Sequence, residues 1–173
     1  MMDLVRIVSD WLENGTNGVN ALLPSVPRDG GDPQPANVLV YDETRDNRPA
    51  RGRLPDADTD LPALVVGMRT LTQGREIVTD DGYLDAELVI QYAAKNVDAY
   101  KAKRDGYTVL RAASWSLRRL RRSDLTVAGR TRNQVTLITV EPVRFEPWFE
   151  RVDDTLIVGT LAVPVTARDH FSI

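Results

Sequence analysis

The chain has 173 residues, of which 42% are hydrophobic and 27% charged, and its net charge is −3. This composition predicts a single globular domain over residues 1–173, large enough to bury a hydrophobic core. The absence of cysteine excludes a disulfide framework, a thiolate metal site and a cysteine nucleophile.

The first fifteen residues, MMDLVRIVSDWLENG, place charged residues among apolar ones. A signal peptide instead has a basic leader, an uninterrupted apolar stretch and a small-residue cleavage site. No stretch approaches the roughly 20 apolar residues that a membrane-spanning helix needs. We therefore expect no leader and no membrane contact, and a protein that is made and assembled in the cytoplasm.

The N-terminal half begins with an amphipathic pattern and continues into an extended segment. Leu4, Ile7, Val8 and Trp11 share one helical face, which predicts a helix of about three turns ending near Asn14-Gly15. Residues 24–62 hold seven of the ten prolines, which predicts mostly extended chain with one short strand at 38–41. Within it, residues 28–60 are expected to form a long extended, charged arm.

The second half predicts strands, one long helix and further strands. Residues 63–70, 75–79 and 84–92 are β-rich, with a turn at Asp80-Asp81-Gly82, and they predict an antiparallel meander. Asn96 is the expected N-cap of a helix over 97–122. Its buried stripe comprises Ala99, Ala102, Gly106, Leu110, Ala113, Leu117 and Leu120. The small Gly106 is interpreted as a close-packing position.

Residues 134–141 and 155–165 are the closing β-rich segments. The fold class is therefore predicted to be α+β, with an antiparallel sheet of about four to six strands under the long helix and the N-terminal helix.

The sequence contains little evidence for a catalytic or metal-binding motif. The acidic DADTD stretch, Asp56 to Asp60, lacks the glycine and the glutamate that a calcium loop requires at its sixth and twelfth positions. His170 is the only histidine, so neither a zinc site nor a histidine-based triad has enough partners. Neither GxGxxG nor GxxxxGK[ST] occurs. We expect no cofactor, no metal and no enzymatic activity.

A cluster of arginines is the most unusual feature of the sequence. Residues 104–132 contain eight arginines and two aspartates, a local charge of +6, so the remainder of the chain carries −9. Helical spacing places Arg111, Trp115, Arg118 and Arg122 on one flank of the buried stripe, whereas Arg119 points away from it. The cluster is compatible with solvated arginines that complement the helix dipole, with a protein interface, or with nucleic-acid binding.

A second candidate site is aromatic. Phe145, Trp148 and Phe149 lie between two β-rich segments, together with Pro142 and Pro147. They are interpreted as a connecting loop that either folds back over the edge of the sheet or exposes an anchor for another subunit.

The order of these segments resembles the tail terminator, or tail-completion, proteins of long-tailed bacteriophages. The likeness covers most of the chain and lies in length and pattern: MMDLVRIVSDWL, a Pro/Gly-rich segment, strands ending in YLDAELVIQYAAK, the helix VDAYKAKRDGYTVLRAASWSLRRL, then VTLITVEPV and TLIVGTLAVPV. The charged arm is longer than such a compact fold needs. No short motif carries the likeness.

The resemblance implies a structural virion protein that forms a homohexameric ring at the head-proximal end of the tail. Such a ring caps the tail tube, contacts the head connector and neck proteins, and lets DNA pass without specific binding. The interface would use Arg111, Trp115, Arg118, Arg119, Arg122, Phe145, Trp148 and Phe149. Two alternatives stay open, namely a head-closure or adaptor protein of the neck, and a nucleic-acid-binding module that uses the helix from Arg111 to Arg122.

Overall fold

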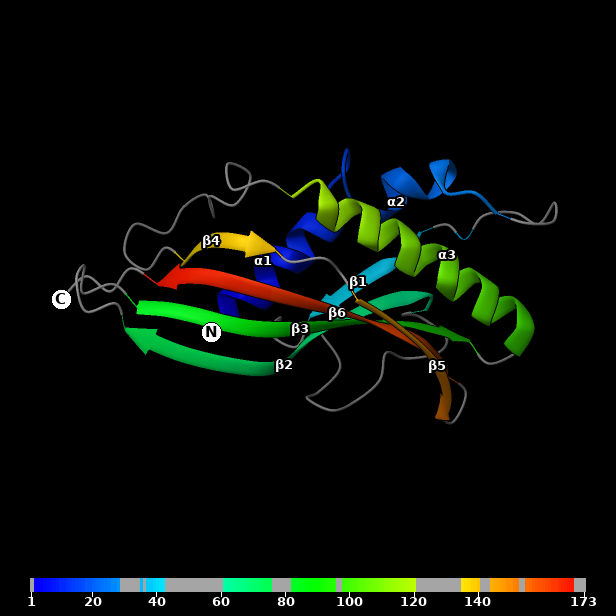
Figure 1. Ribbon diagram of the computed structural model, residues 1–173. Helices are drawn as coiled ribbons and strands as arrows, with labels where there is room; N and C mark the ends of the chain where they lie inside the picture. The colour runs from blue at the N-terminus through cyan, green and yellow to red at the C-terminus, as the bar shows by residue number, and fades with distance from the viewer. Residues whose placement is uncertain are drawn as a thin grey trace.

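The computed structural model describes residues 2–28, 35, 37–42, 61–75, 82–95, 98–120, 135–140, 144–152 and 155–169. In this part of the chain, the helices lie together on one face of a long sheet (Figure 1). The helices are α1 (Met2–Leu12), α2 (Val19–Leu22), the 3-10 turn η1 (Leu23–Ser25) and α3 (Ala99–Arg118). The strands are β1 (Leu39–Asp42), β2 (Ala63–Arg75), β3 (Gly82–Lys95), β4 (Val135–Val140), β5 (Arg144–Val152) and β6 (Thr155–Asp169).

The sheet has the strand order β1-β2-β3-β6-β4, and β5 pairs with β6 on the same edge as β4. Strand β6 is long enough to serve both, because β5 pairs with its residues 155–162 and β4 with its residues 165–169. The predicted α+β class is confirmed, and the sheet is mostly antiparallel. One strand departs from this pattern, since β1 runs parallel to β2. A parallel pair needs a long crossover, and residues 43–62 provide the length.

Several helix and strand boundaries differ from the predicted ones. Strand β2 runs unbroken from Ala63 to Arg75 because it pairs with β3 along its whole length. Helix α3 begins at Ala99, since the Asp98 carboxylate accepts a hydrogen bond from the backbone N–H of Lys101 at 3.0 Å. The expected cap, Asn96, lies outside the described residues, as do the end of the predicted helix at 121–122 and most of the predicted arm at 28–60. Helix α2 and η1 were not predicted.

The core lies between the helices and the sheet. It is built from buried aliphatic side chains of α1, α3 and the central strands, among them Leu4, Val8, Leu88, Ile90, Leu110, Leu117 and Leu161. Helix α3 approaches the sheet closely at Gly106, where an added Cβ would come within 2.8 Å of Val158 and 2.9 Å of Tyr92. The interpretation of Gly106 as a close-packing position is therefore confirmed.

A buried ion pair ties the chain after η1 to α3. The Arg28 guanidinium donates to the Asp105 carboxylate, and the two side chains are only 5% and 14% exposed. The pair lies close to the buried Tyr92, and desolvation raises the pKa of the Tyr92 hydroxyl well above its ordinary value; Asp105 raises it further and Arg28 lowers it. The start of the predicted arm at Arg28 is thus fixed to α3.

Candidate interaction site

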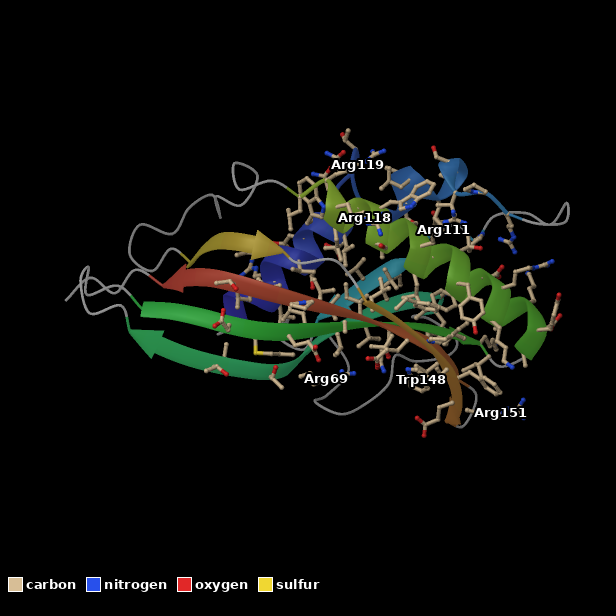
Figure 2. All side chains as sticks on the ribbon, viewed as in Figure 1. Arg69, Arg111, Arg118, Arg119, Trp148 and Arg151 are labelled. Atoms are coloured by element: carbon tan, nitrogen blue, oxygen red, sulfur yellow. The ribbon has the colours of Figure 1, made fainter. Side chains whose placement is uncertain are left out.

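The C-terminal half of α3 carries the predicted arginine cluster. Arg111, Arg118 and Arg119 are exposed and Trp115 is half-buried, and the three arginines follow the outer side of the helix (Figure 2). The Arg111 guanidinium lies 5.4 Å from the centroid of the Trp115 ring, a cation–π distance. We call Arg111, Trp115, Arg118 and Arg119 the arginine surface. Arg122 lies outside the described residues.

The inner side of the same helix segment explains why this face points outward. Leu110, Ala113 and Leu117 are buried against the sheet and α1, as the helical period predicted. The indole N–H of Trp11 on α1 donates to the carbonyl oxygen of Ser116 at 2.9 Å, which fixes the two helices together. The buried stripe and this bond leave the arginine side chains facing solvent.

The arginine surface differs in its electrostatic environment from three other described arginines. Arg6, Arg28 and Arg69 each pair with a carboxylate. Among the residues that the structure describes, no carboxylate pairs with Arg111, Arg118 or Arg119. Because uncompensated guanidinium groups attract anions, this surface favours an acidic protein surface or phosphate as its partner.

The N-terminal half of α3 meets β5 in a second exposed patch, which we call the aromatic surface. Its members are Tyr100, Lys103 and Tyr107 of α3 with Phe145 and Phe149 of β5. The four aromatic side chains are 76%, 42%, 42% and 56% exposed in chain order. Tyr107 and Phe145 meet edge to face with ring centroids 5.5 Å apart, and the Lys103 ammonium lies 3.3 Å from the centroid of the Phe149 ring.

The segment that supplies these phenylalanines was predicted as a loop and is a strand. Its two halves pair with β6, and the register shifts between Glu146 and Phe149, around Pro147. Proline is tolerated here because β5 is an edge strand. Pairing with β6 overrides the loop signal of Pro147, and it holds Phe145 and Phe149 beside α3.

Trp148 does not join the predicted cluster, because it lies on the sheet face away from α3 (Figure 2). Its indole N–H donates to the Thr160 hydroxyl at 2.7 Å, and the Gln91 amide donates to the same oxygen at 3.3 Å. On this face Arg69 also reaches Glu87 at 2.9 Å and Glu146 at 3.5 Å. Trp148 is therefore part of a polar network that holds β5 in place.

Sequence reasoning missed three members of the aromatic surface. Tyr100 and Tyr107 are seven residues apart, two helical turns, so they share the outer face of α3 with Arg111 and Arg118. The seven-residue spacing of the two tyrosines could have been recognised from the sequence alone. Lys103 could not be assigned without knowing that β5 lies beside it.

The described residues contain no cluster of three or more His, Asp or Glu side chains able to hold a metal ion. The calcium-like stretch Asp56 to Asp60 and His170 lie outside the described residues. None of the described helices is both long and apolar enough to cross a membrane. A comparison of the chain with models of known protein families and with curated protein sequences finds no match.

Proposed function

We propose that this chain is a structural virion protein that forms a ring at the head-proximal end of a phage tail. The ring would cap the tail tube and join it to the head connector, and the particle would be assembled in the host cytoplasm. The observation that carries the proposal is the outer face of α3, where arginines without a described carboxylate partner continue into exposed aromatic rings. Arginine and aromatic residues are enriched in protein interfaces and among their energetic hot spots.

The fold supports the same role. A mostly antiparallel sheet with one long helix and an N-terminal helix on a single face matches the order of elements on which the resemblance to tail terminator proteins rests. In this proposal the protein acts by binding and geometry, with the tail tube protein and the neck proteins as partners. A homohexamer follows from the resemblance, and DNA would pass through the ring without specific contacts.

A head-closure or adaptor protein of the neck is the nearest alternative, since it would use the same kind of surface. Pull-down with purified tail tube protein and, separately, with purified connector distinguishes the two roles. A tail terminator binds the end of the tail tube, whereas a protein that binds only the connector belongs to the head side of the neck.

A nucleic-acid-binding module is the alternative from another class, and the cation–π pair of Arg111 and Trp115 beside Arg118 is the observation that favours it. The charge of −9 outside residues 104–132 opposes it, because a polyanion is repelled by the rest of the chain. Salt dependence of binding to duplex DNA tests this alternative directly.

The proposed function is tested by measuring the mass of the oligomer that the full chain forms in solution, and that of the double variant Arg111→Glu, Arg118→Glu. We expect a single ring-sized species for the unmodified chain and its loss in the variant. Arg6→Glu is the control for a charge reversal elsewhere, because Arg6 is an exposed arginine on a different helix, α1. Rings that survive the double variant while DNA binding is lost would instead favour the nucleic-acid module.

A further inference from the structure

Exposed large hydrophobic side chains are confined to two places in the part of the chain that the structure describes. Four belong to the aromatic surface at β5, and the fifth is Leu39 on β1, which is 42% exposed. Strands β1 and β5 lie on the two opposite outer edges of the sheet. Among the described residues, the exposed large hydrophobic side chains are thus divided between the two ends of the strand order.

Both edges of the sheet have structural features that hinder pairing with another strand. Next to β1, the side-chain amide of Asn20 accepts from the Val38 N–H at 3.0 Å and donates to the Val38 carbonyl at 2.9 Å. On β5, Pro147 and the register shift between Glu146 and Phe149 interrupt a regular ladder. These features disfavour the addition of another strand, so we expect a partner to bind through side chains.

One member of the aromatic surface, Phe145, is packed against the backbone of the sheet. Gly159 has a φ of +62°, and a Cβ added there would come within 2.8 Å of the Phe145 ring. The ring therefore lies directly against the backbone of β6, and it also contacts Tyr107 edge to face. Pre-ordered aromatic side chains bind with a smaller entropic cost, which is a property of interface anchors.

We propose that the aromatic surface of one copy packs against the β1 edge, around Leu39, of the next copy. This inference rests on the proposed function, and it specifies which surfaces join neighbouring subunits. The contact joins two different patches, so it is head-to-tail and can repeat around a closed ring. It removes from water the exposed hydrophobic side chains at both edges, and the arginine surface, which continues the same outer face of α3, extends the contact.

The side-chain chemistry favours a protein partner over nucleic acid at this patch. Phe145 and Phe149 have no hydrogen-bonding group, and Lys103 already lies over the Phe149 ring. Nucleic acid would be held chiefly through its phosphates, which the arginine surface suits better. A second copy offers an apolar side chain, Leu39, of the kind that aromatic rings bury favourably.

Single-cysteine variants test this contact in the full chain, which has no cysteine of its own. Leu39→Cys and Phe149→Cys proteins are mixed, treated with a short bis-maleimide and separated on a denaturing gel. We expect a cross-linked dimer in the mixture and its loss when either variant is treated alone. Thr16→Cys mixed with Phe149→Cys is the matched control, because Thr16 is exposed but lies at neither edge.

A second measurement does not depend on the cysteine variants. Sedimentation of the variant Phe145→Ala, Phe149→Ala, once its circular dichroism matches that of the unmodified chain, should show self-association weakened by about tenfold or more.

The outcomes separate the contact from the ring. If rings form but Phe149→Cys cross-links to itself, or if the mixture gives no cross-link, this contact is wrong. The proposed function would then still stand. A chain that stays monomeric up to millimolar concentration would overturn both.

Discussion

The ring of Phe145 lies against the backbone of Gly159, and Leu110 of α3 closes on the same glycine from the core. An added Cβ would come within 2.8 Å of Phe145 Cε2 and 2.9 Å of Leu110 Cδ1. Gly159 is therefore the point at which β6, β5 and α3 meet. Its missing side chain makes room for both neighbours, and its positive φ of 62° suits glycine better than any other residue.

Gly159→Ala should lower the free energy of unfolding by about 2 kcal/mol or more, because it adds a steric clash to an unfavourable backbone conformation. Urea denaturation measures this change. Gly67→Ala is the matched control within β2, since the nearest atom to its added Cβ would be a Val89 methyl at an ordinary 3.8 Å. Equal effects of the two substitutions would show that Gly159 is not a packing constraint.

Asp105→Asn should destabilise the chain by about 3–5 kcal/mol, because it leaves the buried Arg28 guanidinium without its carboxylate. The Nε and Nη1 atoms of Arg28 have no hydrogen-bond partner among the described residues, so the Asp105 carboxylate is the main described group that compensates the charge. Asp10→Asn breaks an exposed pair with Arg6 and should cost at most about 1 kcal/mol. Thermal unfolding of the two variants side by side gives the comparison.

Alkaline pH should destabilise the protein through Tyr92. Burial raises its pKa in the folded state above the ordinary value of 10.0, so the unfolded chain releases this proton first as pH rises. The stabilising contribution is complete below about pH 10 and decreases above it, by up to about 1.4 kcal/mol per pH unit. Tyr92→Phe should remove this part of the slope in urea titrations between pH 9 and 11. An identical slope in both proteins would contradict the assignment.

The long helix shows how far the sequence could predict the structure. Its period placed Leu110 and Leu117 in the core and Arg111 and Arg118 outside, and both assignments are confirmed. Its start was misplaced because the Asp98 cap competes with Asn96 two residues earlier, and only geometry shows which side chain reaches a free backbone N–H.

Strand β5 and the buried ion pair could not be predicted from the sequence either, and the reason differs from that for the helix start. In β5, Pro147 and the charged neighbours of Phe149 are typical of a loop, and their strand conformation depends on pairing with β6. Arg28 and Asp105 are 77 residues apart, and no local pattern links them. The parallel direction of β1 likewise depends on the course of the chain between two strands and leaves no periodic signal.

Thr160→Val should cost about 1–3 kcal/mol, because it removes the oxygen that accepts hydrogen bonds from both Trp148 and Gln91 in a buried position. Tryptophan fluorescence should shift as Trp148 loses its partner. Thr166→Val is the matched control on the same strand, since Thr166 donates to Asp85 at an exposed site. If Thr160→Val changes neither the stability nor the tryptophan fluorescence, the network does not hold β5.

The claim that this chain acts as a ring-forming structural protein is tested most directly by native mass spectrometry of the full chain over a range of concentrations and salt. We expect a single closed oligomer, six copies by the resemblance, that the substitutions Arg111→Glu and Arg118→Glu abolish. A chain that remains monomeric and binds duplex DNA with an affinity that falls steeply as salt increases would contradict it.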